Sequence, residues 1–307
     1  MSILVELPPD QYDRRAFAKF NETSTGFDLD IARAMMWMSQ LAYETHVPDT
    51  INRVSPFWDL SGVKLLSQPA HSTLPLTDTR GIIASKGDAT IVAFAGTDPL
   101  HLLNWVSDFT LGRPKAPVHQ GFVDAAAAVW DDVKSALAAA LARKSPIFIT
   151  GHSLGAAIAV ATADFAREQL QLADAQIYLY GCPRVGRDDF VALYNGTFGR
   201  TTYRLVHGTD IVPTVPPPGL GFHHVGRYLA CARGAKFSAS QLTTNVGSDE
   251  PMANAGIGEQ VRNLLSGVSE NTRTDVVGRL TVLLPAGIGD HLPDRYCAAL
   301  TPASLRF

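Results

Sequence analysis

Apolar residues follow two spacings along this chain, and the change from one to the other predicts its elements. β-branched and aromatic runs predict strands at residues 63–66, 80–85, 90–94, 146–150, 176–180, 203–206 and 224–231. Apolar positions three and four apart predict helices over residues 31–42, 119–141, 154–170 and 257–265, with a short last helix after residue 292. The first of these helices is expected to end before Pro48. Strands that alternate with helices indicate an α/β fold with a mainly parallel central sheet and an antiparallel start.

Two long stretches lack this periodicity. Residues 1–27 are polar and irregular apart from a short apolar start, and residues 234–256 are rich in Ser, Thr, Asn and Gly, which predicts a loop. We expect a single domain over residues 1–307, with an insertion at about 232–289 between the last strand and the last helix.

The turn between the strand at 146–150 and the helix at 154–170 carries the strongest chemical signal. Gly151-His152-Ser153-Leu154-Gly155 matches the pattern G-x-S-x-G. A serine that attacks a carbonyl stands on a strained strand-to-helix turn, and glycines let the two backbones pass close to it. Ser153 is therefore the candidate nucleophile. The alternative is a glycine-rich turn with an idle serine.

A serine nucleophile needs a base to take its proton and a carboxylate to orient that base. Asp210 follows the strand at 203–206 and precedes Ile-Val-Pro, which makes it the best candidate acid; the alternative is an aspartate that only caps the turn. In hydrolases with this kind of turn, the catalytic residues follow one another along the chain in the order Ser, Asp, His. Three histidines after Asp210 could therefore be the base: His223, His224 and His291.

Composition narrows the class of protein. Hydrophobic residues make up 46% of the 307 residues, charged residues 18%, and the net charge is −3, which gives no electrostatic case for nucleic acid. The chain shows neither an apolar run long enough for a membrane span nor the pattern of a signal peptide. We therefore expect a cytoplasmic protein, or one exported by a route that the N-terminus does not reveal. Three distant cysteines and the lack of zinc-like spacing predict neither a disulfide framework nor a metal site.

The segment from Pro99 to Asn104 is an apolar loop that contains Leu100, Leu102 and Leu103. It leaves the end of a predicted strand close to the expected site. Two interpretations are equally consistent with the sequence: ordinary packing, or a lid with one apolar face.

Several further motifs, in the same order along the chain, resemble the class 3 lipases, the family that includes the triacylglycerol lipases of filamentous fungi. They are Phe94-Ala95-Gly96-Thr97, Asn104-Trp105-Val106-Ser107-Asp108, His119-Gln120-Gly121-Phe122, Gly151 to Ala157, Gly181 to Gly186, Arg204 to His207 with Asp210 to Pro213, and His224-Val225-Gly226. The resemblance covers roughly residues 30–230 and the segment around His291. It implies an α/β-hydrolase fold, with a mostly parallel sheet, helices on both faces and a short lid at about residues 98–104.

Carried over residue by residue, the resemblance implies that Ser153, Asp210 and His291 form a catalytic triad. It places the oxyanion hole at the backbone N–H groups of Thr97 and Leu154, and it gives His224 a structural role. His152 is expected to be a structural hydrogen-bonding residue. His291 also lies between Gly289 and Pro293, on a loop where an imidazole could move between serine and leaving group, whereas His224 lies in a predicted strand.

The resemblance implies a monomeric serine ester hydrolase that cleaves acylglycerols or related lipid esters at a lipid–water interface, without a metal or organic cofactor. A short-chain or feruloyl-type carboxylesterase or a phospholipase A1 would use the same residues. A non-catalytic binding protein of the same fold is the alternative from another class, and such proteins usually lack a member of the triad.

Overall fold

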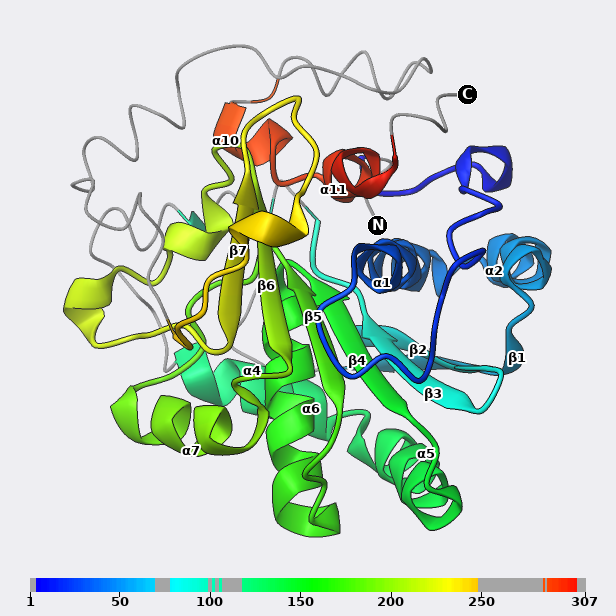
Figure 1. Cartoon of the computed structure of the whole chain (residues 1–307), viewed down its shortest axis with the longest axis horizontal. Helices are drawn as coiled ribbons and strands as arrows, with labels where there is room; N and C mark the ends of the chain where they lie inside the picture. Colours follow the sequence, from blue (N-terminus) through cyan, green and yellow to red (C-terminus); the bar gives the residue numbers. More distant parts are fainter. Residues whose placement is uncertain are drawn as a thin grey trace.

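A computed structural model describes residues 4–69, 78–98, 101–102, 105–106, 118–247, 284 and 286–302 of the chain. Its centre is a seven-stranded sheet in which the strands follow one another in chain order (Figure 1). The strands are β1 (Ser61–Pro69), β2 (Asp78–Lys86), β3 (Ala89–Phe94), β4 (Ile147–His152), β5 (Gln176–Tyr180), β6 (Thr202–His207) and β7 (Arg227–Cys231). β1, β2 and β3 pair antiparallel and the later pairs are parallel, which confirms the expected mixed sheet.

The helices that connect the parallel strands cover one face of the sheet. They are α4 (Val118–Ala127), α5 (Trp130–Arg143), α6 (Leu154–Leu170) and α7 (Asp188–Phe198) (Figure 1). Crossovers between parallel strands are almost always right-handed. Because each new strand is added on the same side of the previous one, right-handed crossovers place all these helices on one face.

The other face is covered by helices from the early and late parts of the chain. α1 (Leu29–Leu41) packs on β3 and β4, and α11 (Pro293–Leu300) packs on α1 and β6. Asp28 caps α1 by accepting hydrogen bonds from the N–H groups of Asp30 and Ile31, at 2.7 and 3.1 Å. The described structure also contains the short helices α2 (Pro48–Val54) and α10 (Ala286–Gly289) and 3₁₀ turns; these turns are η1 (Pro9–Gln11), η2 (Ala42–Glu44), η3 (Ser55–Trp58), η4 (Val212–Thr214), η5 (Pro218–Leu220) and η6 (Ala239–Gln241).

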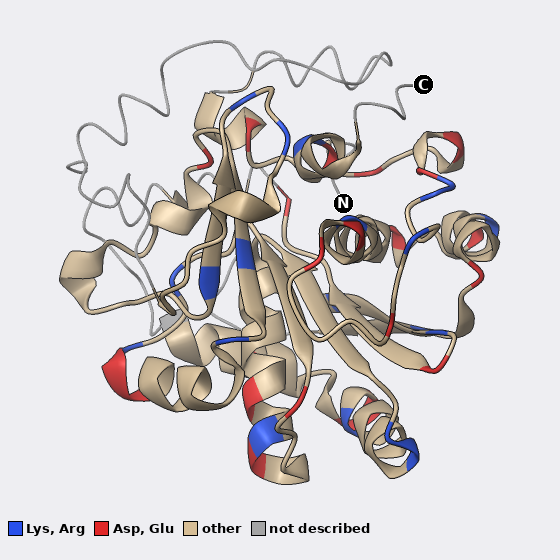
Figure 2. Cartoon of the chain, viewed as in Figure 1, with Lys and Arg blue, Asp and Glu red and all other residues tan. Residues whose placement is uncertain are grey.

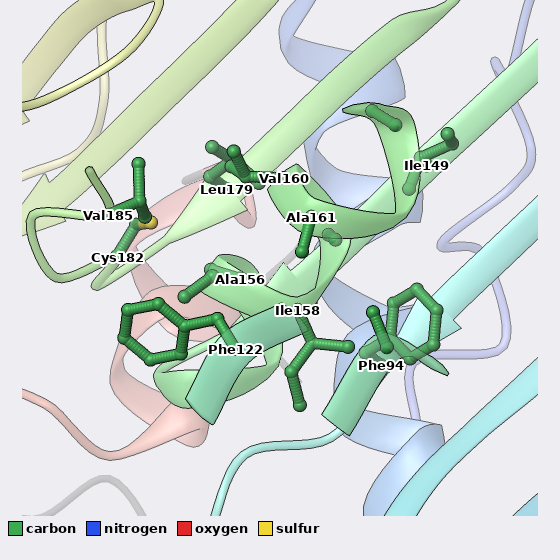
Figure 3. Close-up of a cluster of buried hydrophobic side chains, with 14 of the residues drawn as sticks. Phe94, Phe122, Ile149, Ala156, Ile158, Val160, Ala161, Leu179, Cys182 and Val185 are labelled. Atoms are coloured by element: carbon green, nitrogen blue, oxygen red, sulfur yellow. The ribbon is translucent and has the colours of Figure 1, made fainter. Parts of the chain in front are cut away.

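Each face of the sheet has its own hydrophobic cluster. β3, β4, β5 and β6 are buried along their whole length, as expected for parallel strands covered on both sides. On the crossover face, small side chains of α6 let this helix approach the sheet closely, and Ile158 packs among Phe94 and Phe122 (Figure 3). On the opposite face the cluster contains methionines of α1 and the rings of several tyrosines and tryptophans.

Charged residues are interspersed by sign over the outer helices and loops, while the strands are mostly uncharged (Figure 2). No helix within the described part of the chain is long and apolar enough to cross a membrane.

The structure corrects four expectations about the elements. The expected long helix from residue 119 is divided into α4 and α5 at Val129, whose backbone leaves the helical region with φ −117° and ψ 8°. Pro48 was expected only to limit the preceding helix, but it is the first residue of α2, a position at which proline is well tolerated. β7 begins at Arg227 rather than at residue 224, since Gly226 interrupts the strand with a φ of +70°.

The fourth correction concerns residues 1–27. The described part of this segment has little regular structure, but it buries apolar side chains against α1, among them Val5, Leu7, Tyr12 and Phe17. The expected helix at residues 257–265 lies outside the described residues.

Candidate active site

Ser153 lies on a strained turn between β4 and α6. Its backbone has φ 61° and ψ −132°, a conformation that non-glycine residues rarely adopt. A Cβ atom at Gly151 would lie 2.2 Å from the carbonyl oxygen of Gly155, and one at Gly155 would lie 2.6 Å from that of Phe94. Both glycines are therefore required by backbone contacts, and together they allow the turn that presents Ser153 at the carboxyl end of β4.

Asp210 and His291 contact each other directly, although they are distant in the sequence. The Nδ1 atom of His291 lies 2.9 Å from Oδ1 and 2.8 Å from Oδ2 of Asp210, and both side chains are buried. Because a carboxylate only accepts, Nδ1 carries the hydrogen, and Nε2 of the neutral ring is left as the basic nitrogen. Among the described residues, neither Nε2 of His291 nor Oγ of Ser153 has a hydrogen-bond partner.

The Asp210 carboxylate accepts two further hydrogen bonds. The hydroxyl of Tyr296, on α11, donates to Oδ2 at 2.6 Å, and the N–H of Val212 donates to Oδ1 at 2.9 Å. Burial and the charge of Asp210 raise the pKa of Tyr296 well above its usual value, so this hydroxyl keeps its proton. These donors stabilise the ionised carboxylate and fix its orientation toward His291.

His152 holds the backbone of His291 in place, in agreement with the structural role expected for it. Its Nε2–H donates to the carbonyl oxygen of His291 at 2.7 Å, so Nδ1 is the acceptor of the hydrogen bond from the Tyr43 hydroxyl at 2.8 Å. Burial, and secondarily the neighbouring His291, lower the pKa of His152 well below its usual value. His152 is therefore neutral, and the two imidazole rings lie 4.6 Å apart.

The other candidate histidines have partners other than Asp210. Nε2–H of His224 donates to the carbonyl of Pro213 at 3.0 Å, and burial lowers its pKa well below the usual value. His223 lies 3.1 Å from the carboxylate of Asp188. His224 precedes β7 rather than lying within it, so the expected strand position was wrong, although its side chain is fully buried. Of the three histidines, the structure brings His291 to Asp210.

The candidate oxyanion residues flank Ser153. Gly96, which follows β3, is so close that a Cβ atom there would lie 2.6 Å from Cβ of Ser153. Thr97 is the next residue and is buried, and Leu154 is the first residue of α6 and is also buried. The N–H of a first helical residue has no partner within the helix, so it can donate a hydrogen bond to an oxyanion.

Of the three leucines expected in a loop, Leu102 is described; it is helical rather than irregular, and it is buried in the same hydrophobic cluster as Leu154. Leu100 and Leu103 lie outside the described residues.

Sequence reasoning missed Tyr43 and Tyr296, which contact His152 and Asp210. Neither belongs to a motif that names a role, and their contacts join residues far apart in the chain. The aromatic residue on the helix after His291 was the one available signal.

Part of this chain is similar in sequence to known lipases. The sequence model of the family described as Lipase (class 3) matches residues 91–220. A secreted mono- and diacylglycerol lipase of Fusarium solani is 36% identical over 134 residues, and a lipase of Rhizomucor miehei is 35% identical over 173 residues. These matches cover 41% and 50% of this chain but only 39% and 45% of the two relatives, so the chain spans less than half of their length.

A solved structure supports the fold. The lipase of Rhizopus microsporus var. chinensis superposes with a TM-score of 0.54 at 24% identity, over 73% of this chain and 82% of that one. The strained turn at Ser153 and the mostly parallel sheet are typical of the α/β-hydrolase fold. The family match, the relatives and the shared architecture lead to one conclusion: this chain has the α/β-hydrolase fold, and its residues 91–220 match the class 3 lipase family.

Proposed function

We propose that this chain is a serine ester hydrolase that cleaves acylglycerols or similar lipid esters through an acyl-enzyme. One observation carries most of this proposal: His291 is oriented by Asp210, while its Nε2 and the Ser153 Oγ have no hydrogen-bond partner among the described residues. A buried polar group without a hydrogen-bond partner costs free energy. A base and a hydroxyl that are both left in this state therefore point to a function.

In the proposed reaction, Nε2 of His291 takes the proton of Ser153 Oγ as the oxygen attacks the ester carbonyl. The new C–O bond moves an electron pair onto the carbonyl oxygen, and the N–H groups of Thr97 and Leu154 donate to that oxyanion. The intermediate collapses by breaking the bond to the alcohol, which leaves with the proton from His291. Water then attacks the acyl-enzyme by the same steps and releases the fatty acid.

The charge of Asp210 favours the imidazolium that forms in both steps. Tyr296 stabilises the carboxylate, and His152 holds the loop that carries His291. None of these steps needs a metal or an organic cofactor.

The preference for lipid esters rests on similarity and on the apolar loop. The Fusarium relative is named a mono- and diacylglycerol lipase, and three leucines follow Thr97, one of the two residues proposed for the oxyanion hole. Hydrolysis of p-nitrophenyl esters from acetate to palmitate, beside an emulsified triglyceride, tests this substrate class. Activity confined to short esters would instead indicate a carboxylesterase, and activity on the sn-1 ester of phospholipids a phospholipase A1.

The nucleophile is tested by Ser153→Ala, which removes one oxygen from a side chain that has no hydrogen-bond partner in the described structure. Loss of a triad member lowers kcat by about 10⁴-fold or more, and the melting temperature is expected to stay close to that of the wild type. An organophosphate should label the wild type at Ser153 and leave the variant unlabelled. Retention of more than a few per cent of activity would show that this proposal is wrong.

We further propose that the chain is one domain in which residues 98–104 form a lid and residues 232–289 an insertion. Ser153 is only 1% exposed, so an ester can reach it only if part of the structure moves. Replacing Leu100, Leu102 and Leu103 with Ser is expected to lower activity on emulsified triglyceride severalfold more than on soluble p-nitrophenyl acetate. Equal losses on the two substrates would indicate plain packing by these leucines.

A further inference from the structure

Asp290, the residue before His291, is a second buried carboxylate beside the candidate base. It does not contact the His291 ring but has partners of its own. The backbone N–H and the hydroxyl of Thr209 donate to its Oδ2 at 2.7 and 2.8 Å. Nε of Arg233 lies 2.9 Å from Oδ1 and 3.0 Å from Oδ2, and Nη2 lies 2.8 Å from Oδ2. None of these groups takes part in the proposed reaction.

Arg233 reaches Asp290 from a tight turn after β7. The N–H of Ala235 donates to the carbonyl of Ala232 at 3.0 Å, and Gly234 has a φ of +73°, which a glycine adopts without strain. Nη2 of Arg233 also donates to the Thr209 hydroxyl at 2.9 Å, so that hydroxyl directs its own hydrogen to Asp290. Arg233, Thr209 and Asp290 therefore form a closed triangle of hydrogen bonds.

This triangle lies directly beside the acid–base pair in sequence and in space. Thr209 and Asp210 are neighbours on one loop, and Asp290 and His291 are neighbours on the other. Thr209 contacts Asp290, and Asp210 contacts His291. The turn at Gly208 is shaped around the carboxylate, because a Cβ atom there would lie 2.3 Å from Oδ2 of Asp290. A displacement of Asp290 would therefore move His291 relative to Asp210.

Charge gives the arginine a second role. A carboxylate one residue from the base would stabilise the protonated imidazole, and the guanidinium opposes that effect. The other titratable or charged groups around His291 belong to five elements or to the residues that follow them. His207 ends β6 and Asp210 follows it, while His152 lies in β4 and Tyr43 in η2. α11 carries Asp294, Arg295 and Tyr296, and Arg233 follows β7. The two histidines have pKa values lowered by burial and stay neutral near pH 7.

We propose that Arg233 and Asp290 act as a positioning pair, which fixes the His291 loop against Asp210 and balances the negative charge next to the base. The inference rests on the proposed function, since it assigns His291 the role of base. Both members are positioning residues: they act through Thr209 and the backbone of His291, and they do not touch the reacting atoms.

The pH profile of kcat/KM on a soluble p-nitrophenyl ester tests this pair, since its acidic limb reports the ionisation of the base. Arg233→Gln leaves the Asp290 carboxylate, still bonded by Thr209, without its cation, and is expected to move the limb about 0.5 to 1 pH unit upward. Asp290→Asn leaves the cation without its carboxylate and is expected to move the limb downward. The double variant should return the limb near its wild-type position while kcat stays about tenfold or more below the wild type.

Two substitutions separate charge from geometry. Arg233→Lys keeps the charge but loses the bidentate contact with Asp290, so kcat should fall while the acidic limb of the pH profile stays in place. Lys236→Gln removes a cation from the same segment that bonds to the carbonyl of Ala298 instead, and it should move neither quantity. Circular dichroism and thermal melting check that each variant is folded.

Opposite displacements in Arg233→Gln and Asp290→Asn support the pair. Displacements of the same sign, or an unmoved limb in both, would overturn the charge role, and an unchanged kcat in the folded double variant would overturn the positioning role. If Arg233→Gln does not fold, the direction of the limb in Asp290→Asn still tests the charge role, and kcat in Arg233→Lys still tests the positioning role. Activity retained in Ser153→Ala would instead refute the function itself, so the two failures are distinguishable.

Discussion

The two faces of the sheet are both buried, but they are built from different chemistry. On the crossover face, α6 brings alanines, valine and isoleucine against the strands, and its cluster is held by apolar packing. On the opposite face, buried hydroxyl groups form hydrogen bonds that link α1, η2, the strands and α11. The bonded pairs are Ser39 with Thr150, Tyr180 with the carbonyl of Ala32, Tyr43 with His152, and Tyr296 with Asp210.

This difference separates stability from positioning. Apolar packing is not directional, so it stabilises a fold without fixing a side chain to a fraction of an ångström. Hydrogen bonds in a buried network are directional, and each unsatisfied group costs free energy. The candidate acid and base contact the polar face, where their orientation is fixed. We therefore expect substitutions on this face to affect kcat, and substitutions on the crossover face to affect the free energy of unfolding.

The largest expected contrast is between His291→Ala and Ile158→Ala. His291→Ala removes the proposed base and should lower kcat by about 10⁴-fold or more with little change in melting temperature. Ile158→Ala leaves a cavity in the crossover-face cluster and should lower the free energy of unfolding by about 2–4 kcal/mol, with kcat per folded molecule unchanged. Urea unfolding and steady-state kinetics measure both quantities. A large loss of kcat in Ile158→Ala would remove the distinction between the faces.

A smaller contrast lies within the polar face, between two buried tyrosines. Tyr296→Phe removes a donor to Asp210 and should lower kcat about 10- to 100-fold, because the carboxylate loses part of its stabilisation. Tyr178→Phe is the matched control: its hydroxyl bonds to Gln176, away from the triad, so it should reduce stability by about 1 kcal/mol and leave kcat unchanged. Equal effects on kcat would mean that the whole face, rather than the contact with Asp210, matters.

The smallest effect concerns pH. Burial lowers the pKa values of His152, His207 and His224 in the folded state, whereas unfolded histidine titrates near 6.5. Below that pH the unfolded chain binds protons that the folded chain does not. Stability is therefore fully present above about pH 6.5 and is lost as pH falls toward the lowered pKa values, by up to about 1.4 kcal/mol per pH unit for each histidine.

His224 allows this pH effect to be measured without a change near the triad. Glutamine at this position can still donate to the Pro213 carbonyl but does not titrate, so His224→Gln should make the decline of unfolding free energy between pH 6.5 and 5 less steep. Urea unfolding at several pH values measures the slope. An unchanged slope would mean that His224 does not contribute to the acid sensitivity.

Local patterns predicted most elements because the periodicity of a helix or strand is itself local. The bounds of α6 (Leu154–Leu170) and β5 (Gln176–Tyr180) agree with prediction residue for residue. The break at Val129 carries no Gly or Pro to mark it, and α2 was missed because Pro48 was interpreted as a stop.

The candidate site was predictable where a residue belongs to a motif or follows a strand end, as Ser153 and Asp210 do. Tyr43, Tyr296, Asp290 and Arg233 were not predictable, because their importance comes from contacts that only the folded chain creates. Sequence order alone also left three histidines as the base, and the contact between His291 and Asp210 is a tertiary one.

The packing of α11 on α1 joins two helices that are made at very different times during synthesis. The whole sheet and the turn at Ser153 come from chain that precedes His291, so they can form on the ribosome before α11 has emerged. We expect the nascent chain to carry its nucleophile without its base until that last helix docks. In refolding, ester hydrolysis should therefore recover later than the secondary structure of the sheet, because closing so long a loop is the slowest contact to make.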